Sequence, residues 1–143
     1  MGQRIYNQDL ELILADGAAA IVADGVTQVG GAAASKKLGP GRFEGVLIID
    51  VSAIDVAGAD EVYHLCLQGA ADSAFTTKEI LAQISLGATA VRPGGAVTSV
   101  IGRYEIPFIT EQHDTVYDWV RLHVDGTGAT FSITMKAWIA ERY

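Results

Sequence analysis

The feature that most restricts the fold is the alternation of short β-prone runs with turn signals. Asp-Gly occurs at 16–17, 24–25 and 125–126, and the chain holds sixteen glycines and three prolines; Asp-Gly favours the tight turns of β-hairpins. Seven runs rich in Val, Ile and Thr lie between such signals, at 18–29, 43–54, 61–69, 79–88, 99–110, 115–125 and 129–140. Short strands at this spacing are typical of a sandwich or barrel, so the sequence predicts an all-β, antiparallel β-sandwich.

The period-two pattern is clearest in the last two runs. One face of the last run carries Phe131, Ile133, Met135, Ala137 and Ile139, and the other carries Thr130, Ser132, Thr134, Lys136 and Trp138. The run before it places Val116, Val120, Leu122 and Val124 opposite Tyr117, Trp119, Arg121 and His123. Alternation of this kind indicates strands with one buried face. Residues 125–128, Asp-Gly-Thr-Gly, should join the two runs as a hairpin.

Two more runs have the same pattern, and one differs from it. Tyr63, Leu65 and Leu67 oppose His64, Cys66 and Gln68, whereas Ile80, Ala82, Ile84 and Leu86 oppose Glu79, Gln83 and Ser85. Both runs predict strands with one buried and one solvent-exposed face. The run 43–54 is apolar on both sides, with Leu47, Ile49 and Val51 against Val46, Ile48 and Ile54. Such a strand is covered on both faces, in the middle of the sandwich or against another subunit.

The length indicates one domain. A chain of 143 residues and 15.1 kDa buries enough surface for a core without disulfides. We assign residues 1–14 to an extended N-terminal arm and residues 15–143 to a single β-sandwich domain. Residues 30–42 begin with Gly-Gly-Ala-Ala-Ala, which cannot anchor a core, so this segment is expected to be a mobile loop.

Charge and cysteine content exclude several function classes. The net charge is −7 and Lys36-Lys37 is the only adjacent basic pair, whereas a groove for nucleic acid needs clustered Lys and Arg. No apolar stretch is long and uncharged enough to predict a membrane span. The first residues lack the layout of a secretory signal. The single cysteine, Cys66, fits a reducing compartment, although a cytosolic protein later released by lysis would look the same.

No motif in the chain predicts chemistry. The three histidines, His64, His113 and His123, lack metal-ligand spacing, and no base adjoins Cys66 in sequence. The glycine-rich stretch 39–45 leads into a strand and lacks the Lys-Ser/Thr ending of a phosphate loop. We therefore predict no catalytic, cofactor or metal residue and no enzyme. A calcium site from separate loops and a pair of carboxylates for sugar hydrolysis stay open, since both depend on three-dimensional placement.

A family resemblance covers most of the chain. The residues that carry it are Leu12–Gly17 with the Ala-rich stretch after it, Gly45–Ser52, Tyr63–Phe75, Glu105–Phe108, Val120–Leu122 and the closing run Phe131–Ala140. The most telling are Leu67-Gln68 leading to Ala71–Phe75, and Val120-Arg121-Leu122. In these segments the chain resembles the capsid cement, or decoration, proteins of tailed bacteriophages, in particular the small jelly-roll type. It departs from that pattern in the Gly-Ala loop at 30–38 and at Gly87–Ala90.

The resemblance implies a jelly-roll-like β-sandwich that binds the capsid exterior of the virion and cements neighbouring major capsid proteins. It implies no reaction, no cofactor, and no direct contact with nucleic acid or membrane. Because the run 43–54 is apolar on both faces and the expected aromatic face is broad, we expect a homo-oligomer, a closed dimer or trimer that matches a symmetry axis of the shell. The alternative is a carbohydrate-binding or adhesion-type β-sandwich module of a virion.

Seven residues are the candidates for interaction. Three lie in the arm, Arg4, Tyr6 and Leu10, because arms gain affinity by ordering on contact. Four are expected on one aromatic face, Tyr117, Trp119, Arg121 and Trp138, since Trp, Tyr and Arg are enriched at interfaces. That face could equally serve as a stacking platform for sugars, or be covered by the arm of the same chain.

Overall fold

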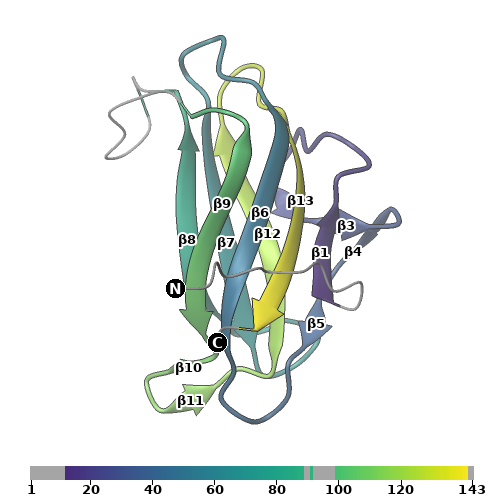
Figure 1. Cartoon of the computed structure of the whole chain (residues 1–143), viewed down its shortest axis with the longest axis vertical. Helices are drawn as coiled ribbons and strands as arrows, with labels where there is room; N and C mark the ends of the chain where they lie inside the picture. Colours follow the sequence, from purple (N-terminus) through teal and green to yellow (C-terminus); the bar gives the residue numbers. More distant parts are fainter. Residues whose placement is uncertain (1–11, 89–90, 92–98, 142–143) are drawn as a thin grey trace, which may run out of the picture.

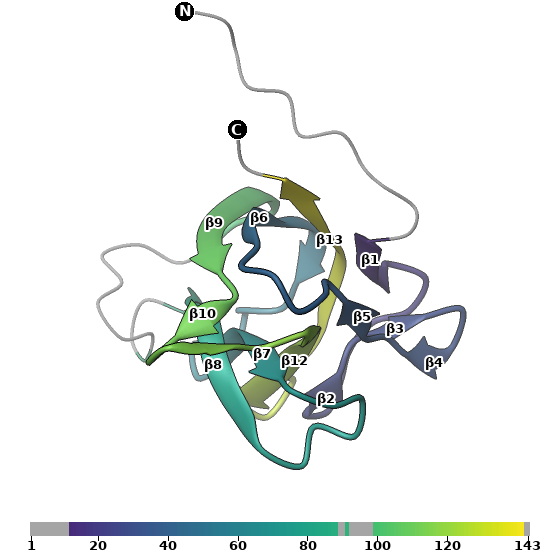
Figure 2. The same cartoon turned by 90° about the horizontal axis from the view of Figure 1, so that it is seen from below.

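The computed structural model describes residues 12–88, 91 and 99–141, and it is an all-β sandwich, as the sequence predicts. Two antiparallel sheets pack face to face (Figures 1 and 2). Sheet A has the order β1-β13-β6-β9 and sheet B the order β2-β12-β7-β8, with β5 also paired to β12. Two short pairs, β3 with β4 and β10 with β11, complete the described strands.

The long strands agree with the predicted runs. Sheet A contains β1 (Ile13–Asp16), β6 (Glu44–Ile54), β9 (Gly102–Ile109) and β13 (Ile133–Glu141). Sheet B contains β2 (Gly25–Val26), β7 (Val62–Ala70), β8 (Lys78–Gly87), β12 (Trp119–Thr127) and the short β5 (Lys36–Lys37). The short pairs are β3 (Gln28–Val29) with β4 (Ala32–Ala33) and β10 (Glu111–Gln112) with β11 (Thr115–Val116).

The chain crosses between the sheets at most connections. Along the sequence, β1, β6, β9 and β13 belong to sheet A, while β2, β7, β8 and β12 belong to sheet B. Of these eight strands, only β7 and β8 follow one another within a sheet. Neighbours within a sheet therefore come from distant parts of the sequence, as when β1 pairs with β13.

The inward faces of the two sheets form the main core. Its fully buried members include Leu47, Ile49, Leu65, Leu67, Leu122, Val124, Ile133, Met135 and Ile139. These are the residues that alternation places on the apolar faces of β6, β7, β12 and β13, so those predictions are confirmed. The hydroxyl of Tyr63 lies 2.5 Å from the Asp55 carbonyl and 3.0 Å from the Ser132 carbonyl, and its ring centroid is 4.9 Å from that of Phe131. Tyr63 thus ties β7 to the ends of β6 and β13.

Two β-bulges reverse parts of the predicted pattern. The register between β7 and β8 shifts between Leu67 and Gln68, so Leu67 pairs with Ala82 whereas Gln68 pairs with Ile80. The extra residue, Leu81, is buried in the core and Ile80 is 49% exposed. The prediction that Ile80 lies on the apolar face is wrong, because a bulge exchanges the two faces of a strand beyond it.

The second bulge lies in sheet A. Thr134 pairs with Ala53 but Met135 pairs with Val51, so Ser52 is the extra residue of β6. Beyond it Ile54 packs against the main core, not on the outer face expected from alternation. The central part of β6, from Val46 to Ile49, is apolar and buried on both sides, as predicted: Leu47 and Ile49 face the core, while Val46 and Ile48 belong to a second cluster.

The first part of the chain differs most from the expectation. Ile13 and Leu14, assigned to the arm, lie in β1, and Leu14 is fully buried; residues 1–11 lie outside the described part of the chain. In the run 18–29 only β2 and β3 are strands. Between Gly17 and Asp24 the chain is mostly alanine, and Ile21 alone forms an isolated bridge, with Ile133, and packs against the core. The segment 30–42 contains β4 and β5, and Leu38 packs against the core.

Candidate interaction surfaces

The single aromatic face expected from the sequence does not form. Trp119 and Arg121 lie on the outer face of sheet B, since they alternate along β12 with the buried Val120 and Leu122. Trp138 lies on the outer face of sheet A, where it pairs with Ile48 and is 4% exposed. The two tryptophans are therefore on opposite sides of the sandwich, because their strands belong to different sheets.

Tyr117 occupies a third position. It precedes β12 and packs against the edge of the main core, where a Cβ added to Gly69 would come within 3.0 Å of the Cβ of Tyr117. Its backbone N–H donates to the Thr110 carbonyl at 2.9 Å. The arm candidates Arg4, Tyr6 and Leu10 lie outside the described residues.

The outer face of sheet B brings Arg121 together with two residues that the sequence analysis did not select. The Arg121 guanidinium carbon lies 4.3 Å from the centroid of the Phe75 ring, and its Nε donates to Oε1 of Gln68 at 2.8 Å. Gln68 is directly opposite Arg121 in the register of β7 and β12. A cation over an aromatic ring is attracted by the negative face of the ring, so Arg121 is fixed on both sides.

Phe75 reaches Arg121 through an unusual backbone conformation. Its φ is +52°, in the left-handed region that residues other than Gly and Asn rarely adopt, and its side chain is 3% exposed. The turn before it is held by Asp72, whose Oδ1 accepts from the Ala74 N–H at 2.9 Å. No periodicity indicates such a contact, since Phe75 lies in a loop; only the pairing of β7 with β12 creates it.

Trp119 has a basic neighbour. β5 pairs with β12 so that Lys37 is opposite Trp119, and the Lys37 Nζ lies 6.0 Å from the centroid of the Trp119 ring. The segment expected to be a loop thus contributes a lysine to this part of sheet B. Together, Lys37, Trp119, Arg121, Gln68 and Phe75 form what we call the Trp119 face.

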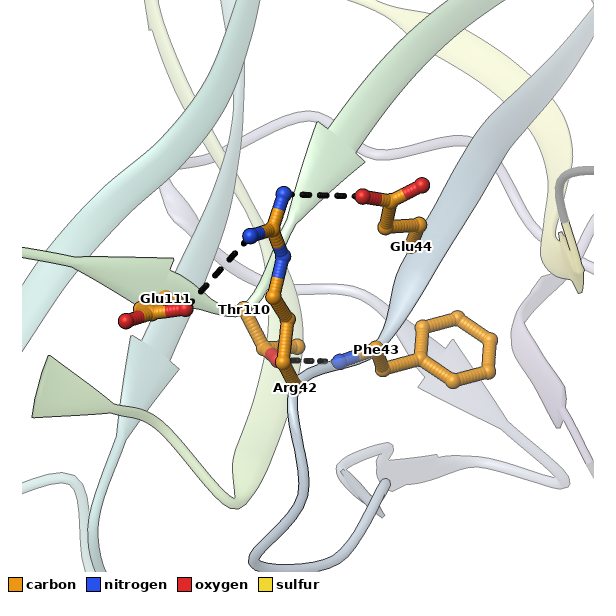
Figure 3. Close-up of polar contacts among 5 residues, drawn as sticks. All are labelled: Arg42, Phe43, Glu44, Thr110 and Glu111. Atoms are coloured by element: carbon orange, nitrogen blue, oxygen red, sulfur yellow. Dashed lines mark hydrogen bonds and ion pairs between the residues drawn. The ribbon is translucent and has the colours of Figure 1, made fainter.

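One end of the sandwich carries a charged cluster (Figure 3). Arg42 lies 2.8 Å from Glu44 Oε1 and 3.8 Å from Glu111 Oε2. Beneath it, the buried Thr110 accepts the Phe43 N–H through Oγ1 at 2.9 Å and donates its own N–H to the Phe43 carbonyl at 3.0 Å. Exposed ion pairs contribute little to stability, so the buried Thr110 contacts are what fix the start of β6.

A hollow of about 570 Å³ lies beside β1 and β2 and is lined mainly by Ala and Gly, together with Met135. Both of its carboxylates are used within the chain. Asp16 accepts the N–H groups of Ala18 and Gly30 at 2.9 and 2.8 Å, and these hydrogen bonds lower the pKa of its carboxyl group. Asp24 accepts the Gly126 N–H at 2.7 Å. The hollow thus presents mostly small apolar side chains.

Three polar residues form a row across sheet B. Asp125 is opposite His64, and His64 is opposite Ser85, with 2.8 Å between His64 Nδ1 and Ser85 Oγ. A hydrolytic triad needs the histidine to bond to the carboxylate as well as to the serine. Among the described residues His64 bonds to Ser85 but not to Asp125, so the row lacks that second hydrogen bond.

Cys66 and His123 are the other reactive side chains on this side of the sandwich. They are directly opposite one another, which makes His64 a diagonal neighbour of His123. Burial and the nearby Asp125 charge raise the pKa of the Cys66 thiol, which keeps it protonated at neutral pH and a poor nucleophile. In the described part of the chain no three His, Cys, Asp or Glu side chains are grouped to hold a metal ion.

We expect the fold to be independent of metal. A chelator should leave the melting temperature unchanged, because the buried contacts described above are apolar packing and hydrogen bonds. Differential scanning calorimetry with and without EDTA measures this. A fall of many degrees on chelation would reveal a metal site that contributes to folding.

The sequence matches no family model and no curated protein. Within residues 12–88, 91 and 99–141 there is no helix with the length and apolar character needed to cross a membrane.

Proposed function

We propose that this protein is a structural component of a tailed-phage virion that binds the outer surface of the capsid and cements neighbouring major capsid proteins. The observation that carries the proposal is the contact between Arg121 and Phe75. The two segments that most resemble cement proteins, Ala71–Phe75 and Val120–Leu122, are far apart in sequence, yet the Arg121 guanidinium lies over the Phe75 ring. The two segments that most resemble cement proteins therefore contact each other on the outer face of sheet B.

The strand order supports the jelly-roll part of the proposal. A jelly roll has eight strands in two sheets, with Greek-key crossings between them, and viral capsid domains use it. The orders β1-β13-β6-β9 and β2-β12-β7-β8 are compatible with that arrangement. A fold alone does not define a function, so the proposal also depends on the resemblance.

The proposed role needs no catalysis. A sugar-binding role is less well supported, because a stacking platform needs several aromatic rings on one face, whereas Trp119 and Trp138 lie on opposite sides of the sandwich. The proposed location is the capsid exterior of the virion, after synthesis in the host cytoplasm, with the major capsid protein as partner.

The Trp119 face is the surface we propose for capsid contact, together with the arm residues Arg4, Tyr6 and Leu10. Trp and Arg are the residue types that most often dominate binding energy at interfaces. Arg121 is already held by Gln68 and Phe75, so little side-chain entropy is lost when a partner contacts it. Trp138, which is buried, and Tyr117, which packs at the edge of the core, are less suited to direct contact.

We expect the free protein to form a closed dimer or trimer. β8 is an edge strand of sheet B with ten residues, and Ile80 on it is half exposed; open edges of this kind pair with other chains. Multi-angle light scattering measures the mass directly. A monomer at high concentration would contradict a preformed oligomer. That result would leave the capsid-binding proposal to be decided separately, by binding to phage heads.

A further inference from the structure

The outer face of sheet A carries a second apolar cluster that is buried in a single chain. Its members are Ile13, Val46, Ile48, Trp138 and Ala140. Ile48 is 0% exposed, Val46 3% and Trp138 4%. All three point away from the main core, because they alternate along β6 and β13 with Leu47, Ile49 and Ile139, which face it.

Val29 and Arg103 are two described residues that contact this cluster. Val29 packs against it but is itself only partly buried. The Arg103 guanidinium lies 5.2 Å from the centroid of the Trp138 ring, and Arg103 is half exposed. Within residues 12–88, 91 and 99–141 the buried Trp138 Nε1–H has no acceptor, although buried donors are almost always paired. A group outside the described residues would supply the hydrogen-bond acceptor that this N–H lacks.

We propose that, in the free protein, residues 1–11 of the same chain cover the outer face of sheet A. The segment ends next to β1, where Ile13, Trp138 and Ile48 are paired in one row. Eleven extended residues reach about 36 Å at roughly 3.3 Å each, and four strands spaced about 4.8 Å apart span only about 14 Å. The segment is thus long enough to cross the whole sheet.

The composition of the segment fits the face. Tyr6, Gln8 and Leu10 are all even-numbered, so an extended segment points their side chains to the same side, where Tyr6 and Leu10 supply apolar surface. Backbone carbonyls or the Gln8 side chain supply acceptors for the Trp138 indole. Residues 92–98, Arg-Pro-Gly-Gly-Ala-Val-Thr, offer no large apolar side chain besides Val97, and residues 142–143 are too few.

This inference concerns the unattached protein and stands apart from the capsid proposal. If both hold, Tyr6 and Leu10 leave sheet A, or share it with the capsid, when the protein attaches.

The test uses Trp138 as its own reporter. In a Trp119→Phe background, Trp138 is the only tryptophan. Removal of residues 1–11 should shift its emission to longer wavelength, raise its quenching by acrylamide several-fold and speed the exchange of its indole N–H. Leu10→Ser should produce part of this change. Asn7→Ser should produce none, because in an extended segment the side chain of residue 7 points to the side opposite that of residue 10. Far-UV circular dichroism reports whether the sandwich remains folded.

Each other outcome overturns the inference. If Trp138 stays equally shielded without residues 1–11, another part of the chain covers it. If shielding in the truncated protein appears only as concentration rises, a second copy covers the face. Should the truncated chain fail to fold, Leu10→Ser and Tyr6→Ser decide, and unchanged quenching in both folded variants rejects the segment as the cover.

Discussion

Replacement of Gly87 by alanine is expected to destabilise the protein by about 4 kcal/mol, from backbone strain and overpacking together. Gly87 has a φ of +142°, a conformation that residues with a side chain rarely adopt. A Cβ there would lie 2.3 Å from the Glu61 carbonyl oxygen and 3.0 Å from the Val62 Cα. Both atoms are backbone, so the clash is relieved only by separating β8 from β7.

The loop that Gly87 contacts is densely connected. The Glu61 backbone carbonyl accepts the Ala88 N–H at 3.0 Å. The side-chain Oε1 of Glu61 accepts the Thr130 hydroxyl at 2.8 Å and the Gly58 N–H at 3.1 Å. A displacement of Glu61 would therefore disturb three connections at once. Domains of this kind are stable by only about 5–15 kcal/mol, so the expected loss is a large part of the total.

Gly102→Ala is the matched control. Gly102 has nearly the same φ, +145°, but no heavy atom lies within 4 Å of its added Cβ. Only the backbone strain remains, roughly 1–2 kcal/mol. Urea denaturation of both variants measures the difference. Equal losses of unfolding free energy would contradict the assigned contact between Gly87 and Glu61.

The sequence predicted the parts of the fold that depend on local periodicity. Alternation in β12 and β13 placed Val120, Leu122, Met135 and Ile139 in the core correctly, because a strand with one buried face carries its pattern in its own residues. The apolar character of β6 on both sides was also readable, and the structure shows a buried cluster on each side of it.

Features that depend on pairing between distant strands could not be predicted. A bulge adds one residue to one strand only, and nothing in the sequence of β8 marks Leu81 as that residue, so Ile80 was placed on the wrong face. The relative positions of the two tryptophans also depend on the pairing of distant strands. Alternation places Trp119 and Trp138 on the outer faces of their own strands. Only the sheet order shows that these two faces lie on opposite sides of the sandwich.

The contact of Arg121 with Phe75 and Gln68 was missed for a similar reason. Phe75 belongs to no periodic run, and Gln68 looks like any polar residue on a wet face. Only the register of β7 with β12 brings the three side chains together. The sequence analysis extends the arm to residue 14, whereas β1 begins at Ile13. Leu12, Ile13 and Leu14 lack an alternating pattern, although Ile13 and Leu14 are buried on the two sides of β1.

Purified expanded phage heads are expected to bind the intact protein, while free major capsid subunits are not. A cement protein joins surfaces that are neighbours only in the assembled lattice. Each contact alone is weak, and contacts made together are strengthened by effective concentration, by up to about 10²–10⁴. The effect of assembly on affinity should therefore be larger than that of any single substitution in the contact surface.

Removal of residues 1–11 should weaken attachment and lower the temperature at which heads burst, with the sandwich still folded. The truncation stops at residue 11 because Ile13 and Leu14 are part of β1 and their loss would damage sheet A. Arg121→Ala should also weaken attachment, since it removes the guanidinium of the Trp119 face. Asp114→Ala, in the exposed turn between β10 and β11, serves as the control and should bind as the intact protein does.

Sedimentation of the protein with expanded heads is the most direct measurement. The intact protein should pellet with heads in a saturable amount that reflects the lattice symmetry, and the form lacking residues 1–11 should require a higher concentration to reach the same occupancy. Equal binding by the two forms would reject the contribution of the arm. Failure of both forms to pellet with heads would contradict the proposal that this β-sandwich is a capsid cement protein.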